Sequence, residues 1–115
     1  MKITQREYKQ AIVLDLVGDL TYDNRGTFKE AVERAKASRC RHLIVNMEQV
    51  QFLDSSGLGL MALMSQNLKL SHIRLSVVNP QSYVREIMNL ANIAKLVPIY
   101  TSEDDAVADR GSAAA

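Results

Sequence analysis

Three polar residues, Asp54, Ser55 and Ser56, stand together inside the otherwise apolar stretch FLDSSGLGL, where Gly57 and Gly59 follow them. An acid beside two hydroxyls could belong to a catalytic or nucleotide-binding loop, accept a phosphoryl group, or cap a helix with no further role. The rest of the chain has to decide between these three interpretations.

The nucleotide-binding interpretation depends on residues 57–62, GLGLMA, which match the dinucleotide pattern G-x-G-x-x-A. That fingerprint should follow its strand directly, whereas about ten residues separate it from the preceding apolar run at 43–47. The next predicted strand also ends at Asn79 and not at the acid that would bind a ribose. We therefore predict no nucleotide cofactor.

The catalytic interpretation lacks partners for the serines. Neither serine lies in the G-x-S-x-G elbow of serine hydrolases. His42 is predicted at the start of a strand and His72 in a connection, where surface or edge positions are expected. No Cys or His cluster has the spacing of a metal site. The sequence predicts neither an enzyme nor a metal protein.

Composition limits the class of protein. The chain has 115 residues, of which 47% are hydrophobic and 23% charged, as in a single soluble domain. The formal net charge is +1 and the Lys and Arg residues are scattered, which argues against a nucleic-acid surface. Residues 1–6 lack an apolar leader, and no apolar run has membrane-spanning length. Cys40 is the single cysteine and cannot form an internal disulfide, which agrees with a reducing compartment. We expect a cytoplasmic protein that binds neither membrane nor nucleic acid directly.

Alternating strand and helix signals predict one α/β domain. Apolar runs predict strands over 3–8, 11–17, 43–47, 74–78 and 96–100. The first two should pair around Lys9 and Gln10, and the run at 43–47, covered on both faces, is the expected centre of the sheet. Asp23 or Asn24 can cap a helix over residues 28–35, and Asn79 followed by Pro80 predicts the start of another. Residues 101–105 suit the start of a final helix.

The stretch FLDSSGLGL leads into a helix after Asp54, and apolar residues around most of its circumference predict burial on most sides. Asp54 or Ser55 can cap this helix, because either side-chain oxygen can accept from N–H groups that the first turn leaves unpaired. A cap does not explain Gly57 and Gly59, each of which costs roughly 1 kcal/mol relative to Ala inside a helix. Close approach by another backbone or by a partner would explain them.

The residues FLDSSGLGLM resemble the signature of STAS-domain anti-sigma factor antagonists, the anti-anti-sigma proteins of bacterial partner-switching systems. The resemblance extends through Val17-Gly18-Asp19-Leu20, the Asn79-Pro80 pair and residues 96–100. It implies a STAS domain over residues 1–109 and a flexible tail over 110–115. It also implies a mixed sheet of four to five strands with about four helices packed against it.

By this resemblance, Ser55 is phosphorylated by a cognate ATP-dependent anti-sigma kinase and dephosphorylated by a PP2C-type phosphatase. The unphosphorylated protein would bind the kinase or anti-sigma factor and release the sigma factor, so the protein is a switch and not an enzyme. The implied partner-binding residues are Asp54, Ser55, Ser56, Gly57, Leu58, Gly59, Asp19, Thr21 and Asp23.

Two departures from the family pattern bear on these expectations. Many members read Gly-Glu-Leu-Asp where this chain reads Gly18-Asp19-Leu20-Thr21, so the role of the final acid does not carry over to Thr21, and whether Asp23 replaces it stays open. A Gly-Gly pair is common before the fourth strand, where this chain has Leu70-Ser71-His72. The second departure concerns the turn and not the fold.

Two alternatives remain at this point. In a receiver-like domain Asp54 itself would take the phosphoryl group, but such a site needs a second acidic pair and a nearby lysine. Asp15 and Asp19 are not adjacent, and Lys95 precedes the last predicted strand. A STAS regulatory or scaffold module controlling a non-sigma partner would differ only in its partner, which the sequence does not identify.

Overall fold

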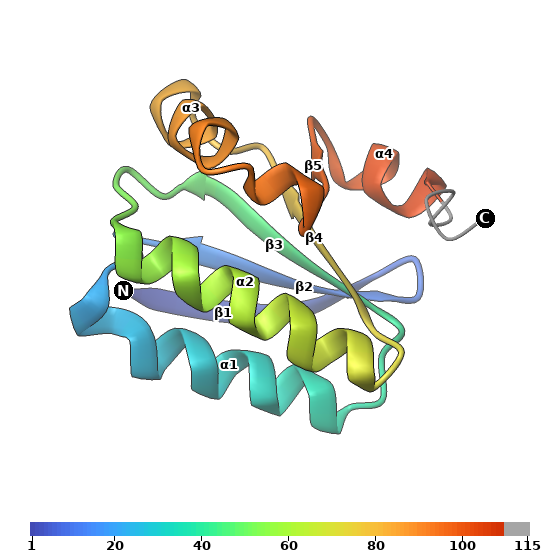
Figure 1. Cartoon of the computed structure of the whole chain (residues 1–115). Coiled ribbons are helices and arrows are strands. Elements are labelled where there is room, and N and C mark those ends of the chain that lie inside the picture. Colours follow the sequence, from blue (N-terminus) through green and yellow to red (C-terminus); the bar gives the residue numbers. More distant parts are fainter. Residues whose placement is uncertain (110–115) are drawn as a thin grey trace.

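The computed structural model describes residues 1–109, in which five strands form one mixed sheet (Figure 1). The strands are β1 (Lys2–Tyr8), β2 (Ala11–Val17), β3 (His42–Gln49), β4 (Arg74–Val78) and β5 (Ile99–Tyr100), and they lie in that order across the sheet. β1 is antiparallel to β2, and β2 to β5 run parallel to one another. β3 is the central strand, as predicted. The predicted flexible tail at 110–115 lies outside the described residues.

Four α-helices accompany the sheet in these 109 residues: α1 (Arg25–Ala37), α2 (Ser55–Leu70), α3 (Ser82–Leu90) and α4 (Glu103–Ala108). There are also two short 3₁₀ turns: η1 (Tyr22–Asn24) directly precedes α1, and η2 (Ile93–Lys95) lies between α3 and β5. α1 and α2 lie side by side over one face of the sheet (Figure 1). The prediction of a mixed α/β sheet with four to five strands and about four helices is confirmed. No helix among the described residues is both long and apolar enough to cross a bilayer.

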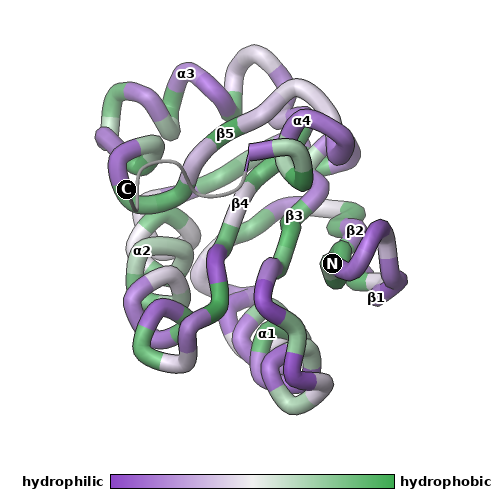
Figure 2. Tube along the Cα trace, turned by 90° about the vertical axis from the view of Figure 1, so that its right-hand side faces the viewer, coloured by the Kyte–Doolittle hydropathy of each residue, from purple (hydrophilic) through white to green (hydrophobic). Residues whose placement is uncertain are grey.

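Both faces of β3 are buried, which explains its continuous apolar sequence. Leu43, Val45 and Met47 belong to the main core beneath α1 and α2, to which α3 also contributes. Ile44 points to the other face, where it belongs to a smaller core with Ala106 of α4. Figure 2 shows the sheet between α1 and α2 on one side and α4 on the other. The sheet is therefore the middle layer of the molecule.

The β1–β2 hairpin turns at Lys9 and Gln10, as predicted. Both residues have positive φ, 47° and 72°, which is the backbone conformation that a two-residue type I′ turn requires. The hairpin places Arg6 and Asp15 on the face that α4 covers, where Arg6 Nε contacts Asp15 Oδ2 (2.6 Å) and Arg6 Nη1 donates to Glu103 Oε1 (3.0 Å). This ion-pair network fastens α4, a helix too short to be stable alone, to the sheet.

Two predicted boundaries are wrong. α3 begins at Ser82 and not at Pro80, because Asn79 has a left-handed backbone (φ 55°) and its N–H donates to the Tyr100 carbonyl oxygen (3.0 Å). Asn79 thus continues the pairing between β4 and β5 and does not cap the helix. The last strand covers two residues and not 96–100, because Leu96 closes η2 with a helical backbone and the pairing with β4 starts only at Ile99.

The burial of α2 is also narrower than predicted. Its fully buried residues form one stripe, Gly57, Met61, Met64 and Leu68, at helical spacing. Leu63, which the sequence pattern assigned to the buried part of the helix, is exposed, and Leu70 at the end of the helix is exposed as well.

His42 is buried, with 7% of its surface exposed, whereas we predicted a surface or edge position. It starts the central strand beside two residues of β4: Arg74 Nη2 lies 3.1 Å from its Nδ1, and Ser76 Oγ lies 2.7 Å from its Nε2. A guanidinium can only donate, so Nδ1 accepts and the proton of the neutral ring is on Nε2. Burial, and then the charge of Arg74, lower the pKa of His42 to about 4.

The neutral, buried His42 predicts that mild acid destabilises the fold. Between the ordinary histidine pKa of 6.5 and about 4, the unfolded chain binds a proton here that the folded chain does not, so stability falls as the pH falls. We expect a loss of up to about 3 kcal/mol across this window. His42→Gln should remove that slope, although it lowers stability at neutral pH. Urea titrations of both proteins from pH 7 to pH 4 measure the difference, and parallel pH profiles would contradict the assignment.

Candidate functional site

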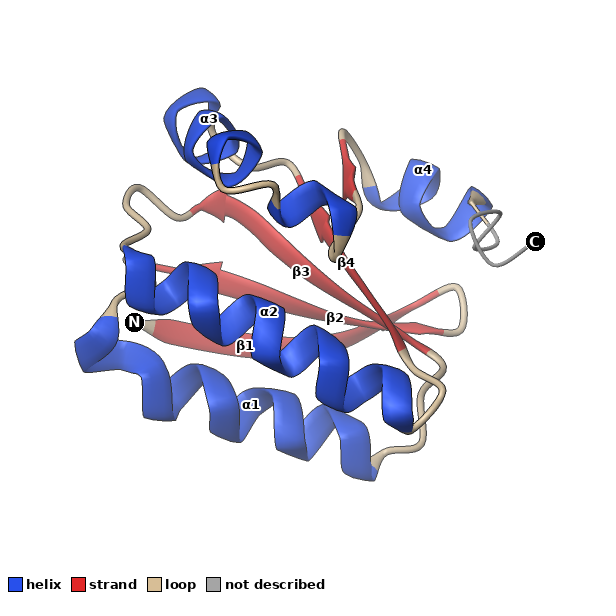
Figure 3. Ribbon diagram, in the orientation of Figure 1, coloured by secondary structure: helices blue, strands red, loops and turns tan. Residues whose placement is uncertain are grey.

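The predicted site lies at the end of the sheet where the parallel strands β2 and β3 finish. Because these strands are parallel, the connection from β2 to α1 and the connection from β3 to α2 emerge at the same end (Figure 3). The first connection contains Asp19, Thr21 and Asp23, and the second leads into residues 54–59. The fold thus brings together two groups of predicted partner-binding residues that are far apart in the sequence.

A backbone seam joins the two connections. Leu20 and Leu53 form an isolated parallel bridge, in which the Leu20 N–H donates to the Phe52 carbonyl oxygen (3.0 Å). The Asp54 N–H donates in turn to the Leu20 carbonyl oxygen (3.3 Å). The side chains of Leu20 and Leu53 are both buried, so apolar packing supports the hydrogen bonds. We call this arrangement the Leu20–Leu53 seam.

Asp54, one of the two predicted candidates, is the N-cap of α2, and its carboxylate binds both sides of the seam. Oδ1 accepts from the Gly57 N–H (2.8 Å) and Oδ2 accepts from the Tyr22 N–H (3.1 Å). The Gly57 N–H lowers the pKa of the Asp54 carboxyl, and the Tyr22 N–H adds to this effect. A negative charge therefore lies beside Ser55, with one carboxylate oxygen bonded to the first turn of α2 and the other to the β2–α1 connection.

The two glycines of the motif have different surroundings. A Cβ on Gly57 would lie 2.5 Å from the Leu20 carbonyl oxygen and 2.8 Å from Leu53 Cδ1, so the seam leaves room only for glycine. The close backbone approach that the sequence suggested is present at this position. A Cβ on Gly59 would meet nothing within 4 Å. Gly59 leaves an open space on the surface of α2.

The first two turns of α2 present an accessible face. Ser55 and Gly59 are exposed, whereas Ser56 and Leu58 are half-buried, and Leu58 packs against the main core. Leu63, with 51% of its surface exposed, follows Ser55 and Gly59 at four-residue intervals, which places all three on one side of the helix. The hydroxyl of Ser55 is therefore accessible at the start of a partly apolar helix face.

The β2–α1 connection lies beside this face. Asp19 and Asp23 are exposed and Thr21 is half-buried. Asn24 is at the N-cap position of α1, one of the two predicted positions, but its side chain donates to the Asp19 carbonyl oxygen (2.6 Å) and not to the helix. This hydrogen bond joins the two ends of the β2–α1 connection, Asp19 and Asn24.

The sequence analysis missed two exposed aromatic residues that flank the seam, Tyr22 and Phe52, with 56% and 41% of their surfaces exposed. The Arg25 guanidinium stacks over the Tyr22 ring, 3.6 Å from its centroid, and Arg25 Nη1 donates to the Tyr22 carbonyl oxygen (2.6 Å). The available signal was their place in the sequence, since Phe52 opens FLDSSGLGL and Tyr22 directly follows Gly18-Asp19-Leu20-Thr21. Exposed aromatic side chains held in fixed positions are typical anchors of protein–protein interfaces.

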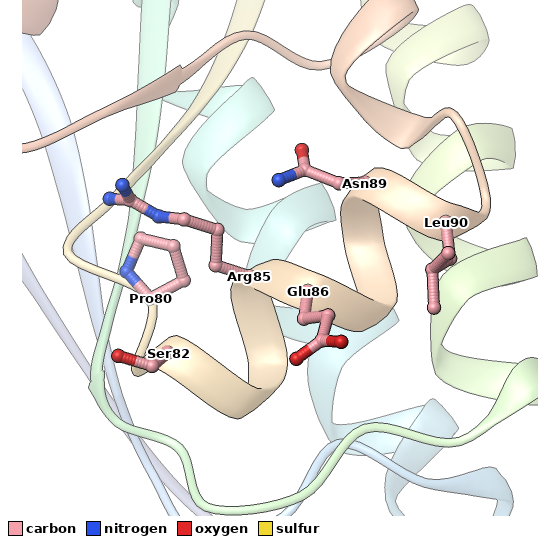
Figure 4. A pocket seen from close by; sticks show the side chains of 6 residues that line it. All are labelled: Pro80, Ser82, Arg85, Glu86, Asn89 and Leu90. Atoms are coloured by element: carbon pink, nitrogen blue, oxygen red, sulfur yellow. The ribbon is translucent and has the colours of Figure 1, made fainter.

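A hollow of about 520 Å³ lies beside α3, outside the predicted site. Its lining residues are Pro80, Ser82, Arg85, Glu86, Asn89 and Leu90 (Figure 4). Arg85 and Glu86 point away from each other in this view, and Arg85 Nε is buried with no hydrogen-bond partner among the described residues. No predicted site residue lines this hollow.

The arrangement around Ser55 favours contact with another protein. His42 is already bonded to Ser76 at the opposite end of β3, so it does not serve as a base for Ser55. Within residues 1–109, no group of three or more His, Cys, Asp or Glu side chains could hold a metal ion. What the site offers is an accessible hydroxyl, a fixed carboxylate and a rim of exposed apolar side chains.

Comparison with known proteins places this geometry in a family. Residues 2–106 match the model of the STAS domain. The anti-sigma F factor antagonist of Paenibacillus polymyxa is 26% identical over 115 residues, which cover 95% of this chain and 94% of that protein. An anti-sigma factor antagonist from Mycobacterium paratuberculosis has a similar solved structure, with a TM-score of 0.83 and 21% identity over 93% of this chain and 91% of that one.

SpoIIAA shares the fold in two solved states. Its unphosphorylated form has a TM-score of 0.75 and 21% identity over 92% of this chain and 93% of that one. The phosphorylated form of the Bacillus protein has a TM-score of 0.68 and 20% identity over 93% of this chain and 97% of that one.

The two glycines of the motif provide a matched pair of tests for the seam. Gly57→Ala should destabilise the protein by about 1 to 3 kcal/mol, because the new methyl group overlaps the Leu20 carbonyl oxygen. Gly59→Ala should leave stability unchanged or raise it by up to about 1 kcal/mol, because alanine favours the helix and meets open space. Urea-induced unfolding of both variants measures the difference. Equal effects of the two substitutions would contradict the close approach at Gly57.

Proposed function

The chain belongs to the STAS domain family, and from this premise we propose that it is a phosphorylation-controlled partner-switching regulator. The unphosphorylated protein binds an anti-sigma factor that is also an ATP-dependent serine kinase, and thereby releases a sigma factor. Phosphorylation of Ser55 blocks this binding, and a PP2C-type phosphatase restores it. In this role the protein is a substrate and binding partner, not an enzyme.

The observation that carries the proposal is the position of Ser55. It is the exposed first residue of α2, next to a carboxylate whose two oxygens are already bonded to Gly57 and Tyr22. A kinase can reach the Ser55 hydroxyl without disturbing the cap. Ser56 is half-buried and lies one residue deeper in the first turn, so Ser55 is the better acceptor.

A phosphate at this position is compatible with the fold and unfavourable for docking. It adds about −1.5 to −2 charge at pH 7 at a helix N-terminus, where unpaired N–H groups and the helix dipole tolerate an anion. The same charge lies beside ionised Asp54 and near the exposed acids Asp19 and Asp23. A partner complementary to the unmodified surface would meet like-charge repulsion or an uncompensated desolvation cost.

The surface around Ser55 has the composition of a docking site. Tyr22, Phe52 and Leu63 supply exposed apolar area, and the Leu20–Leu53 seam fixes the backbone between the two connections. The predicted contacts Asp19, Thr21, Asp23 and residues 54–59 lie between or beside these side chains. A preorganised patch of this kind loses little conformational entropy on binding.

The receiver-like alternative, in which Asp54 takes the phosphoryl group, is disfavoured by the cap geometry. Both carboxylate oxygens accept backbone hydrogen bonds, so phosphorylation there would release the start of α2. A STAS module that controls a non-sigma partner would use the same surface and differ only in what docks on it.

Replacing Ser55 tests the proposed switch. Ser55→Asp should weaken binding of the anti-sigma kinase by about thirtyfold or more, because an uncompensated charge at an interface costs roughly 2 to 5 kcal/mol. Ser55→Ala should bind like the parent and resist phosphorylation. Calorimetric titration measures the affinities, and thermal melts of the same samples should show that the Asp variant loses no stability.

Ser82→Asp is the matched control, because Ser82 is the exposed first residue of α3 and receives the same charge at an equivalent helix position. It should leave the affinity nearly unchanged. If Ser55→Asp binds as tightly as the parent, or loses binding only because it unfolds, the proposed mechanism is wrong.

A further inference from the structure

Two adjoining hollows lie at the end of the molecule remote from Ser55, where α1 and α2 end and β3 and β4 begin. One, of about 590 Å³, is lined by Lys36, Arg39, Cys40, Arg41, Ser71, His72 and Ile73. The other, of about 300 Å³, includes Lys69, Arg74 and Lys95 in its lining and shares Ile73 with the first. Figure 2 faces this end of the molecule and shows hydrophilic colouring along the connections into β3 and β4.

The two hollows concentrate positive charge that is scattered in the sequence. Six of the 14 basic residues and one of the 13 acidic residues, Asp109, line them. Because the net charge of the chain is only +1, the rest of the molecule is acidic. The sequence analysis found the Lys and Arg residues scattered along the chain, but the fold brings six of them together at this end. Within residues 1–109, Lys36, Arg39 and Arg41 form no ion pair with a carboxylate.

Stabilisation of the helix ends does not account for this charge. A helix C-terminus carries roughly half a negative charge, so α1 and α2 together offset about one of the cations. Two of the last carbonyl groups of α2 are already satisfied, because the His72 and Ile73 N–H groups donate to the carbonyl oxygens of Lys69 (3.0 Å) and Leu68 (2.9 Å). At least two cations of the larger hollow remain without compensation.

The residues that follow α1 and α2 have a left-handed backbone but are not glycine. Arg39 and His72 follow the C-caps of α1 and α2 with left-handed φ of 63° and 61°. Glycine is the usual residue at this position, because a side chain there costs conformational energy. The chain nevertheless places an arginine and a histidine at these two positions, and both line the larger hollow.

We propose that the larger hollow binds a small ligand that carries two or more phosphate groups. Lys36, Arg39 and Arg41 supply three positive charges, Arg39 and Arg41 can each donate two parallel hydrogen bonds, and Ser71 adds a hydroxyl donor. One phosphate carries about −1.5 to −2 charge at pH 7, so it balances at most the two uncompensated cations, and a second phosphate group is needed to engage all three basic side chains. The volume of the hollow is in the range of small-molecule sites.

This site is separate from the partner surface. α2 has 16 residues and rises about 1.5 Å per residue, so its two ends are about 24 Å apart. A ligand at the basic end leaves Ser55 accessible, and the inference stands whether or not Ser55 is phosphorylated.

Calorimetric titration with inorganic tripolyphosphate at about 0.15 M salt tests the proposal under physiological screening. We expect saturable binding to one site and binding of orthophosphate that is weaker by at least about tenfold. Arg39→Gln and Arg41→Gln should each weaken tripolyphosphate binding by at least about tenfold. Lys29→Gln removes one charge from an exposed position elsewhere on α1 and should change the affinity by less than about twofold.

Cys40 reports where the ligand binds, because it is the single cysteine and lines the same hollow. Tripolyphosphate should slow its alkylation by iodoacetamide in the parent and not in Arg41→Gln. The proposal is wrong if tripolyphosphate does not bind, if Lys29→Gln weakens binding as much as Arg41→Gln, or if Cys40 is not protected. A short DNA duplex that binds through Arg39 and Arg41 when tripolyphosphate does not would assign the surface to nucleic acid and overturn the proposal.

Discussion

The contact between the Leu20 carbonyl group and the first turn of α2 is the constraint on which the candidate site depends. The Leu20 oxygen accepts from Asp54 N–H and lies 2.5 Å from the position that a Cβ of Gly57 would take, so helix and connection approach more closely than any residue with a Cβ would allow. Asp54 then joins the two segments through its side chain. Because of these contacts, Ser55, the first residue of α2, is held at a fixed place on the surface.

The parallel sheet gives the molecule two chemically different ends. Strands β2 to β4 run in one direction and α1 and α2 return in the other, so helix N-termini gather at the Ser55 end and helix C-termini at the opposite end. Unpaired N–H groups make the first end tolerant of an added phosphate. The second end collects cations from separate connections and is suited to anions. The two ends of the sheet thus differ in the charge that they attract.

Local signals predicted most of the fold and the centre of the site. Hydrophobic periodicity predicted the hairpin, the central strand and the helix after Asp54, and capping chemistry narrowed the cap of that helix to Asp54 or Ser55. Non-local packing decided the rest. His42 is buried because β4 lies beside it, and Asn79 pairs with β5 in place of capping α3. The partner of Gly57 could not be foreseen, because Leu20 reaches it only through the alignment of β2 and β3.

Amide hydrogen exchange of the protein with and without its anti-sigma factor tests the central claim most directly, because it maps the docking surface on the unmodified chain. The account predicts that binding slows exchange in residues 19–25 and 52–63, the two segments that the seam holds together, and leaves residues 36–41 unchanged. Slower exchange confined to other segments, with residues 52–63 exchanging as in the free protein, would contradict it.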